Sequence, residues 1–268
     1  SFVYGGQPSA EWLKNRERKH TAEKLDDRRT RHTLAWTDPR TGLELRCVAI
    51  EYRNFPTVEW TLYFKNTGTN DTPILSDIQA LELRLDRPTQ GEFLLHHHKG
   101  DDCAPDSYEP RRLPLAPKSE HRFAPVGGRP TNQGFPYFNL EWPGAGLIIV
   151  VGWSGQWAAQ FTRDGSNGLR VRAGQELTHF TLRPGEEVRT PLIVLQFWKG
   201  DRRRAQNVWR RWMLAHNLPR TRGGQLPPPI FTSCSGGFFP GLKCNEADEL
   251  RFIDAFTGAG IKLDYWWM

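Results

Sequence analysis

Three short stretches carry side chains that could do chemistry. The first lies at the end of the apolar segment 229–234, and the second lies within the apolar segment 261–268. The third is a polar loop at residues 99–110. Carboxylates accept hydrogen bonds from hydroxyl groups, and an indole packs its face against the apolar face of a sugar ring while its N–H stays polar. The residues predicted to bind substrate are Cys234, Ser235, Asp264, Trp266, Asp101 and Asp102.

Each candidate also has a purely structural interpretation. Asp101 and Asp102, together with Asp106, form a solvated acidic loop in the interpretation that we favour, although they could also approach a sugar. Asp264 either points inward near a site or forms a structural salt bridge, and the sequence does not separate the two. Cys234 and Ser235 have the best positional argument, but no base partner is visible for either, so no catalytic residue is assigned.

Metal and cofactor sites are not predicted. The run His96-His97-His98 could suggest a metal site, but consecutive strand residues point to opposite faces, so at most two of these side chains share a side. The four cysteines lack the paired spacing of a zinc site or a redox motif.

Composition excludes general disorder, because 38% of the 268 residues are hydrophobic and 12% are aromatic. The net charge of +6 comes from interspersed charges, and no nucleic-acid-binding motif accompanies it. The arginines at 202–204, 210 and 211 could bind phosphate, but they are assigned to a solvated helix face or to pairing with carboxylates on the sheet. No apolar run has the length of a membrane span.

The elements that would position these residues are mostly strands. Segments such as 43–52 and 58–66 alternate polar and apolar residues, and Gly, Asn, Asp and Pro separate them, which predicts antiparallel sheets packed as a sandwich. Residues 134–161 read as a hairpin whose second strand, 147–151, continues through Gly152 to Trp157. Trp153 and Trp157 could form a sugar platform, but core packing is favoured. The charged stretch 11–31 is predicted to be a solvated helix or an irregular arm.

After residue 200 the pattern changes. Asp201 is predicted to cap a helix that runs to Asn217, and residues 218–228 form a Pro-rich linker. Residues 229–268 then read as strand, helix and strand, with Asn245 as the helix cap and Gly260 as its end. We therefore expect a β-supersandwich at residues 1–217 and the first βαβ unit of a truncated (β/α)₈ barrel at 229–268.

Three segments, in this order, carry a resemblance to a known family: FPYFNL…GWSGQW, GDRRRAQNVWRRWMLAHNLPR and GIKLDYWWM. The sequence resembles the α-galactosidase-type glycoside hydrolases of family 36 in clan D over nearly its whole length. The resemblance implies an N-terminal sandwich, a catalytic barrel and retaining hydrolysis of terminal α-linked galactose by two Asp residues. It places both Asp residues on barrel strands beyond Met268, and the sugar-binding Asp pair directly after that residue.

One departure from the family bears on specificity. The family usually has a Trp near the end of the first barrel strand, where this chain has Cys234-Ser235, so an N-acetylated or otherwise substituted sugar is an alternative to galactose. The expected partner is an α-galactoside-type carbohydrate, with no nucleic acid, membrane or cofactor. We expect the 268 residues to be an inactive part of a longer enzyme. The alternative is a carbohydrate-binding or oligomerisation module, and the sequence leaves the oligomeric state and the compartment open.

Overall fold

The alternating segments of the sequence form strands in a computed structural model that describes residues 1–88, 90–237 and 243–268. The described chain divides into two compact units, Ser1–Trp212 (unit 1) and Met213–Met268 (unit 2), and each is described by itself. The proposed limits of the sandwich, linker and barrel segments remain predictions. Residues 235–241, which follow the first predicted strand of the 229–268 segment, lie partly outside the described residues.

Within the described part of unit 1, the largest sheet has ten strands, and every paired neighbour is antiparallel. Its order is β10 (Pro110–Pro114), β9 (Leu94–His98), β12 (Tyr137–Trp142), β13 (Ala145–Gly152), β18 (Leu192–Lys199), β6 (Thr57–Asn66), β5 (Leu43–Tyr52), β4 (Arg29–Thr37) and β3 (Lys19–Lys24), with β17 (Glu187–Arg189) also on β6. This arrangement confirms the prediction of a mainly β, antiparallel fold.

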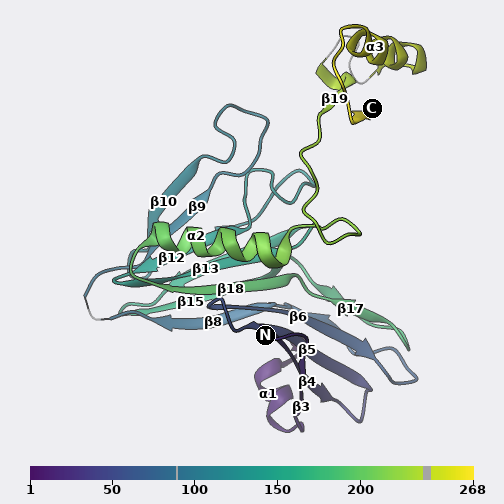
Figure 1. Cartoon of the computed structure of the whole chain (residues 1–268). Helices are drawn as coiled ribbons and strands as arrows, with labels where there is room; N and C mark the ends of the chain where they lie inside the picture. The colour runs from purple at the N-terminus through teal and green to yellow at the C-terminus, as the bar shows by residue number, and fades with distance from the viewer. Residues whose placement is uncertain (89, 238–242) are drawn as a thin grey trace. The chain divides into compact units, whose positions relative to one another are not determined.

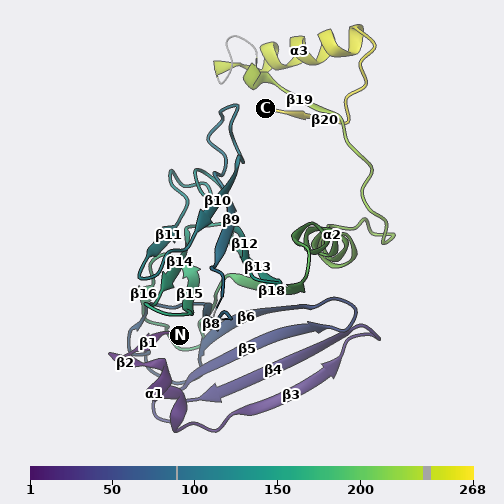
Figure 2. The ribbon, with the colours of Figure 1, turned by 90° about the vertical axis from the view of Figure 1, so that its left-hand side faces the viewer.

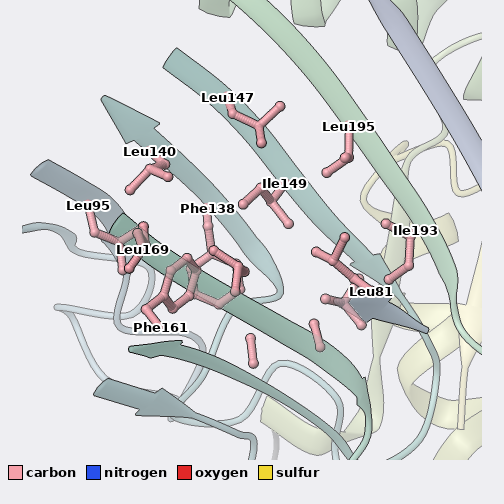
Figure 3. Packing of buried hydrophobic residues seen from close by; sticks show 14 of the residues in the cluster. Leu81, Leu95, Phe138, Leu140, Leu147, Ile149, Phe161, Leu169, Ile193 and Leu195 are labelled. Carbon is pink, nitrogen blue, oxygen red and sulfur yellow. The ribbon is translucent and has the colours of Figure 1, made fainter. Parts of the chain in front are cut away.

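A second sheet faces the first and closes the main core. Its order is β11 (Glu120–Phe123), β14 (Trp157–Arg163), β15 (Gly168–Gln175) and β8 (Leu81–Asp86). Leu81 and Phe161 from this sheet pack against Phe138, Ile149 and Leu195 from the larger one (Figure 3). Because each sheet has one apolar face, packing the two sheets together buries both apolar faces at once.

A smaller layer extends the core around the N-terminus. The strands β1 (Val3–Tyr4), β2 (Gln7–Pro8), β7 (Leu75–Ser76) and β16 (His179–Phe180) form one sheet, and helix α1 (Ser9–Lys14) lies beside them (Figure 2). Trp12 of α1 is fully buried against Phe2, and both belong to a cluster with Phe64 of β6.

Two predictions made from the sequence of unit 1 were wrong in part. The charged stretch 11–31 is helical only at residues 11–14, the end of α1, because β3 within it pairs with β4 as the exposed edge of the large sheet. Lys and Glu on such an edge discourage pairing with another chain, which is why the segment reads as solvated. Beyond Gly152 the predicted strand does not continue to residue 157, because the chain leaves the large sheet after Gly152 and enters the facing sheet at Trp157.

Helix α2 (Arg202–Trp212) covers the face of the large sheet that points away from the main core (Figure 1). The backbone N–H groups of Arg203 and Arg204 donate to Asp201, which confirms the predicted cap. Gln196 of β18 is fully buried beneath the helix and donates to the carbonyl of Ala205 at 3.2 Å. At the end of α2, the buried ring of Trp212 meets Tyr52 edge-on.

Arg163 carries a charge into the interior of unit 1. Its side chain has no exposed surface, and its guanidinium donates to Glu92 at 3.1 Å and to the carbonyls of Ser166 and Gly168. The guanidinium also lies 5.4 Å from the centre of the Phe93 ring. A buried cation is tolerated when its donors are satisfied in this way.

Unit 2 contains the predicted strand, helix and strand. Strand β19 (Thr232–Cys234) is followed by the 3₁₀ turn Ser235–Gly237, helix α3 (Glu246–Gly258) and strand β20 (Tyr265–Trp267), and the two strands pair in parallel. Asn245 accepts from the backbone of Asp248, whose side chain accepts from the backbone of Asn245, so the predicted cap is a full capping box. Gly260, at φ +72°, follows the helix end, as its sequence position predicts.

The described residues contain no helix with the length and apolar character needed to cross a membrane.

Candidate functional site

The strand pair of unit 2 fixes which side chains share a face. Its register places Cys234 opposite Trp267 and Ser233 opposite Trp266. The indole N–H of Trp266 donates to Glu249 of α3 at 2.6 Å, and its ring lies 5.8 Å from that of Phe256. Trp266 therefore lies on the face covered by α3. Because side chains alternate along a strand, Trp267 and Cys234 lie on the opposite face.

Asp264 has a role in pairing the two strand segments. Its carboxylate accepts from the backbone N–H of Phe231 at 2.9 Å, and its own N–H donates to the Phe231 carbonyl at 2.8 Å. This reciprocal pair joins the segments one residue before the parallel ladder begins. Of the two interpretations from the sequence, the observed contacts match a structural one, although through backbone hydrogen bonds rather than a salt bridge.

Cys234 and Ser235 lie at the carboxyl end of β19, as predicted from the sequence. Cys234 is half-buried with a free thiol, and Ser235 is 4% exposed. The carboxyl end of parallel strands is where α/β folds place their binding residues. The described residues contain no group of three or more His, Cys, Asp and Glu side chains that could hold a metal ion.

The acidic loop of unit 1 is an internally paired network. The hydroxyl of Ser107 lies 3.1 Å from a carboxylate oxygen of both Asp101 and Asp102, and Lys99 lies 2.7 Å from Asp102 and from Asp106. The backbone N–H of Cys103 and the hydroxyl of Ser107 lower the pKa of Asp101. Lys99 is the largest cause of the lowered pKa of Asp102. Both carboxylates are therefore ionised, and hydrogen bonds within the loop hold them in place.

The two tryptophans of the GWSGQW segment have different environments. Trp157 is fully buried, and its indole N–H donates to the carbonyl of Pro130 at 2.7 Å, which confirms the favoured core interpretation. Trp153 is half-buried against the main core, and the guanidinium of Arg189 lies 5.2 Å from its ring centre. Because Trp157 has no exposed surface, the pair cannot form a sugar platform.

A groove that the sequence did not reveal runs beside α2 in unit 1. Its volume is about 490 Å³, and we call it the α2–β9 groove. It is lined by residues of α2 and of the outer faces of β9, β10 and β12, among them His96, Arg112, Tyr137, Asn139, Arg202 and Trp209. Asn139 and His96 are register partners, as are His96 and Arg112, so three polar side chains from adjacent strands form a row.

Burial changes the chemistry of the histidines in this groove. It lowers the pKa of His96, His97 and His98 below the ordinary histidine value, so the imidazoles favour the neutral form. His96 lies 2.7 Å from Glu141, which opposes the effect of burial on its pKa. The triple-His run was visible in the sequence, but its partners were not, because they come from strands and a helix distant along the chain.

Comparisons with known proteins show the fold of the chain. No protein-family model matches the sequence, and no curated protein matches it either. Its structure is similar to that of the α-galactosidase from Lactobacillus brevis, with a TM-score of 0.70 and 17% identity over 91% of this chain and 33% of that one. The GH36 α-galactosidase AgaA from Geobacillus stearothermophilus gives a TM-score of 0.68 and 16% identity over 90% of this chain and 34% of that one.

The galactosidase domain of the α-galactosidase–sucrose kinase AgaSK gives a TM-score of 0.67 and 16% identity over 93% of this chain and 36% of that one. The chain thus spans about a third of the length of the structures it matches, namely their N-terminal portion. Unit 1 holds 212 of the 268 residues, so coverage of about 90% extends into unit 2. At these identities the similarity establishes a shared fold.

Proposed function

We propose that this chain is the N-terminal part of a retaining α-glycosidase that hydrolyses terminal α-linked galactose or a related, for example N-acetylated, sugar. The observation that carries the proposal is the similarity of fold over about 90% of the chain to structures of α-galactosidases. The βαβ unit adds to it, because a parallel strand pair after a β-sandwich is the order that the resemblance implies.

The proposed substrate class is carbohydrate. Structures of AgaA variants are described in complex with raffinose, with stachyose and with 1-deoxygalactonojirimycin. A retaining glycosidase needs one carboxylate to attack the anomeric carbon and a second to protonate the leaving oxygen. We assign neither role to a residue of this chain, and we propose that residues 1–268 alone do not hydrolyse glycosides.

The proposed organisation is a sandwich at residues 1–217, a linker at 218–228 and the start of a catalytic barrel at 229–268. In that barrel Cys234 and Ser235 would lie near the sugar, because they end the first strand. A small thiol and hydroxyl leave more room than an indole, which favours a sugar with a bulkier substituent. Asp101 and Asp102 remain proposed as sugar contacts from the sandwich loop.

Trp266 and Asp264 are less favourable substrate contacts than the sequence suggested. Each already has a partner within unit 2, Glu249 for Trp266 and the backbone of Phe231 for Asp264. A sugar contact by either side chain would have to add to these hydrogen bonds or replace them.

The proposal is tested by comparing the 268-residue chain with a protein in which the reading frame continues beyond Met268. We expect the longer protein to release nitrophenol from a nitrophenyl α-galactoside or its 2-acetamido analogue, and the 268-residue chain to match a mock preparation. Turnover by the purified 268-residue chain would contradict the assignment of chemistry to a later segment. A longer protein inactive on both glycosides would remove the glycosidase proposal.

Within the longer protein, Cys234→Trp tests the specificity argument. If the space at Cys234 accommodates a substituent, the indole should lower kcat/KM for the 2-acetamido glycoside more than for the galactoside. An equal loss on both substrates would contradict a role in specificity. Leu177→Trp, at a side chain of unit 1 that is 89% exposed and lies outside the proposed sugar contacts, is the control.

A further inference from the structure

The α2–β9 groove has an excess of positive charge. Arg111, Arg112 and Arg202 all line it, whereas Glu141 is the acidic side chain at its histidine row. Glu141 lies 2.7 Å from His96 and 3.9 Å from Arg202, and Glu109 lies 3.7 Å from Arg111. Among the described residues, no carboxylate lies within 4.0 Å of Arg112. Since the histidines favour the neutral form, the guanidinium groups set the charge of the groove.

Two buried polar atoms of the groove lack a hydrogen-bond partner in the described structure, Nδ2 of Asn139 and Nδ1 of His98. Asn139 is 8% exposed, and its Oδ1 accepts from the indole N–H of Trp198 at 2.9 Å, which directs its amide nitrogen away from that bond. A buried donor without a partner costs about 1–3 kcal/mol. Both atoms are enclosed by protein, so an acceptor in the groove removes this cost only after a side chain of the groove wall moves.

Aromatic side chains line another part of the groove. Tyr137 stacks on Phe135 with ring centres 4.8 Å apart, and Trp209 of α2 meets Tyr137 edge-on at 6.0 Å. An aromatic wall with a few converging polar groups is typical of small-molecule sites, whose volumes run from about 300 to 1,000 Å³. Aromatic faces suit the apolar C–H face of a sugar ring, and guanidinium groups suit a carboxylate or a sulfate.

We propose that the α2–β9 groove binds a saccharide that carries a carboxylate or sulfate group. The anionic group lies against Arg112 and Arg202, and the sugar ring packs on Tyr137 and Trp209. The proposal goes beyond glycoside hydrolysis. It rests on unit 1 alone and requires no turnover.

A larger cavity of about 1010 Å³ in unit 1 supports such an assignment less well. Several of its polar side chains satisfy one another, since Arg170 pairs with Glu82, Arg122 with Glu176, and Arg172 donates to Gln160. None of the unpartnered buried atoms in the described residues belongs to its lining.

The test measures binding to the 268-residue chain by tryptophan fluorescence and calorimetry. The probes are α-linked digalacturonate, a 6-sulfated galactose disaccharide and neutral galactobiose, all at one ionic strength because charge contacts weaken with salt. We expect at least one acidic probe to bind tenfold or more tightly than galactobiose, and the stronger of the two identifies the anionic group. Neutral and acidic disaccharides binding equally, or no binding by either acidic probe, would overturn the proposal.

Arg112→Ala should weaken binding of the acidic disaccharide tenfold or more, while Arg53→Ala, an exposed arginine in the turn after β5, should leave it unchanged. Circular dichroism verifies that both variants fold, and Arg112→Lys should restore part of the affinity by keeping the charge without the bidentate geometry. Equal losses in Arg112→Ala and Arg53→Ala would show attraction to net charge and overturn the assignment. Because no step measures hydrolysis, the result does not depend on the proposed enzyme activity.

Discussion

Unit 1 and unit 2 both combine strands with a helix, yet they bury their aromatic residues very differently. In unit 1 Trp157 and Phe161 are fully buried between the facing sheets. In unit 2 Tyr265 is 63% and Trp267 74% exposed. A sandwich covers the apolar faces of two sheets at once, whereas α3 covers only one face of the β19–β20 pair. The comparison teaches that an apolar strand sequence predicts a strand but does not guarantee burial within its own unit.

Truncating one apolar side chain in each unit should give the largest difference in the free energy of unfolding between the two units. Phe161→Ala removes a ring that has no exposed surface in unit 1, and we expect it to lower the free energy of unfolding by about 3–5 kcal/mol. Leu250→Ala in α3 removes a side chain that is 53% exposed and should change it by no more than about 0.5 kcal/mol. Denaturant unfolding and hydrogen exchange of each unit measure both effects. Similar losses in the two variants would remove the contrast between the units.

Within unit 1, two arginines on adjacent strands of one sheet test whether burial sets the cost of losing a charge. Arg163→Leu removes the donor to the Ser166 carbonyl and one of the donors to Glu92 and to the Gly168 carbonyl, and should cost about 3 kcal/mol. Arg170 on β15 is 56% exposed and pairs with Glu82. Arg170→Leu should therefore lower the free energy of unfolding by only about 0–1 kcal/mol. Urea unfolding gives both values. A larger loss for Arg170→Leu would show that burial does not rank these ion pairs.

In unit 2 local hydrogen bonds should matter more than packing. Asn245→Ala removes the side-chain acceptor of the capping box and should destabilise α3 by about 1 kcal/mol. The effect should appear as faster amide exchange in α3 and not in β14 of unit 1. Asn245→Ser, which keeps a capping oxygen, is the control and should retain most of the protection. Unchanged exchange in Asn245→Ala would mean that contacts other than the cap hold the helix.

The smallest expected effect is a pH dependence of unit 1. Burial lowers the pKa of His96, His97 and His98 in the folded state, so the unfolded chain binds more protons just below the ordinary pKa. The associated stability is present above the ordinary histidine pKa and is lost as the pH falls through the lowered, folded value. Melting temperature should therefore fall between pH 7.5 and 5.5. His97→Gln should reduce that slope, and an unchanged slope would exclude His97 as a source.

Much of the fold followed from local patterns in the sequence. The alternation in residues 43–52 and 58–66 predicts two strands, which the structure shows as β5 and β6. Asp201, Asn245 and Gly260 mark helix ends because their side chains or backbone satisfy requirements that arise within a few residues. Local patterns also explain why the prediction at residues 11–31 was wrong in part. Mixed charges are as typical of an exposed edge strand as of a solvated helix.

The residues that could bind a ligand were harder to predict. Trp266 has the composition of a sugar contact, but only the register of β19 with β20 and the position of α3 reveal that its indole faces Glu249. The row of Arg112, His96 and Asn139 likewise depends on strand order, since β10, β9 and β12 are neighbours in the sheet but not all consecutive in the chain. A row of side chains across neighbouring strands can be identified only when the strand register is known, and a single sequence does not contain that register.

The sequence by itself determined the types of elements, their order and the ends of the helices, because hydrogen bonding and side-chain alternation within a segment set these features. Tertiary structure alone decided which tryptophans are core, which carboxylates are paired within their loop and which polar atoms of the α2–β9 groove lack partners. The reason is that burial and pairing depend on segments far apart in the chain, brought together only when the two sheets and α2 pack.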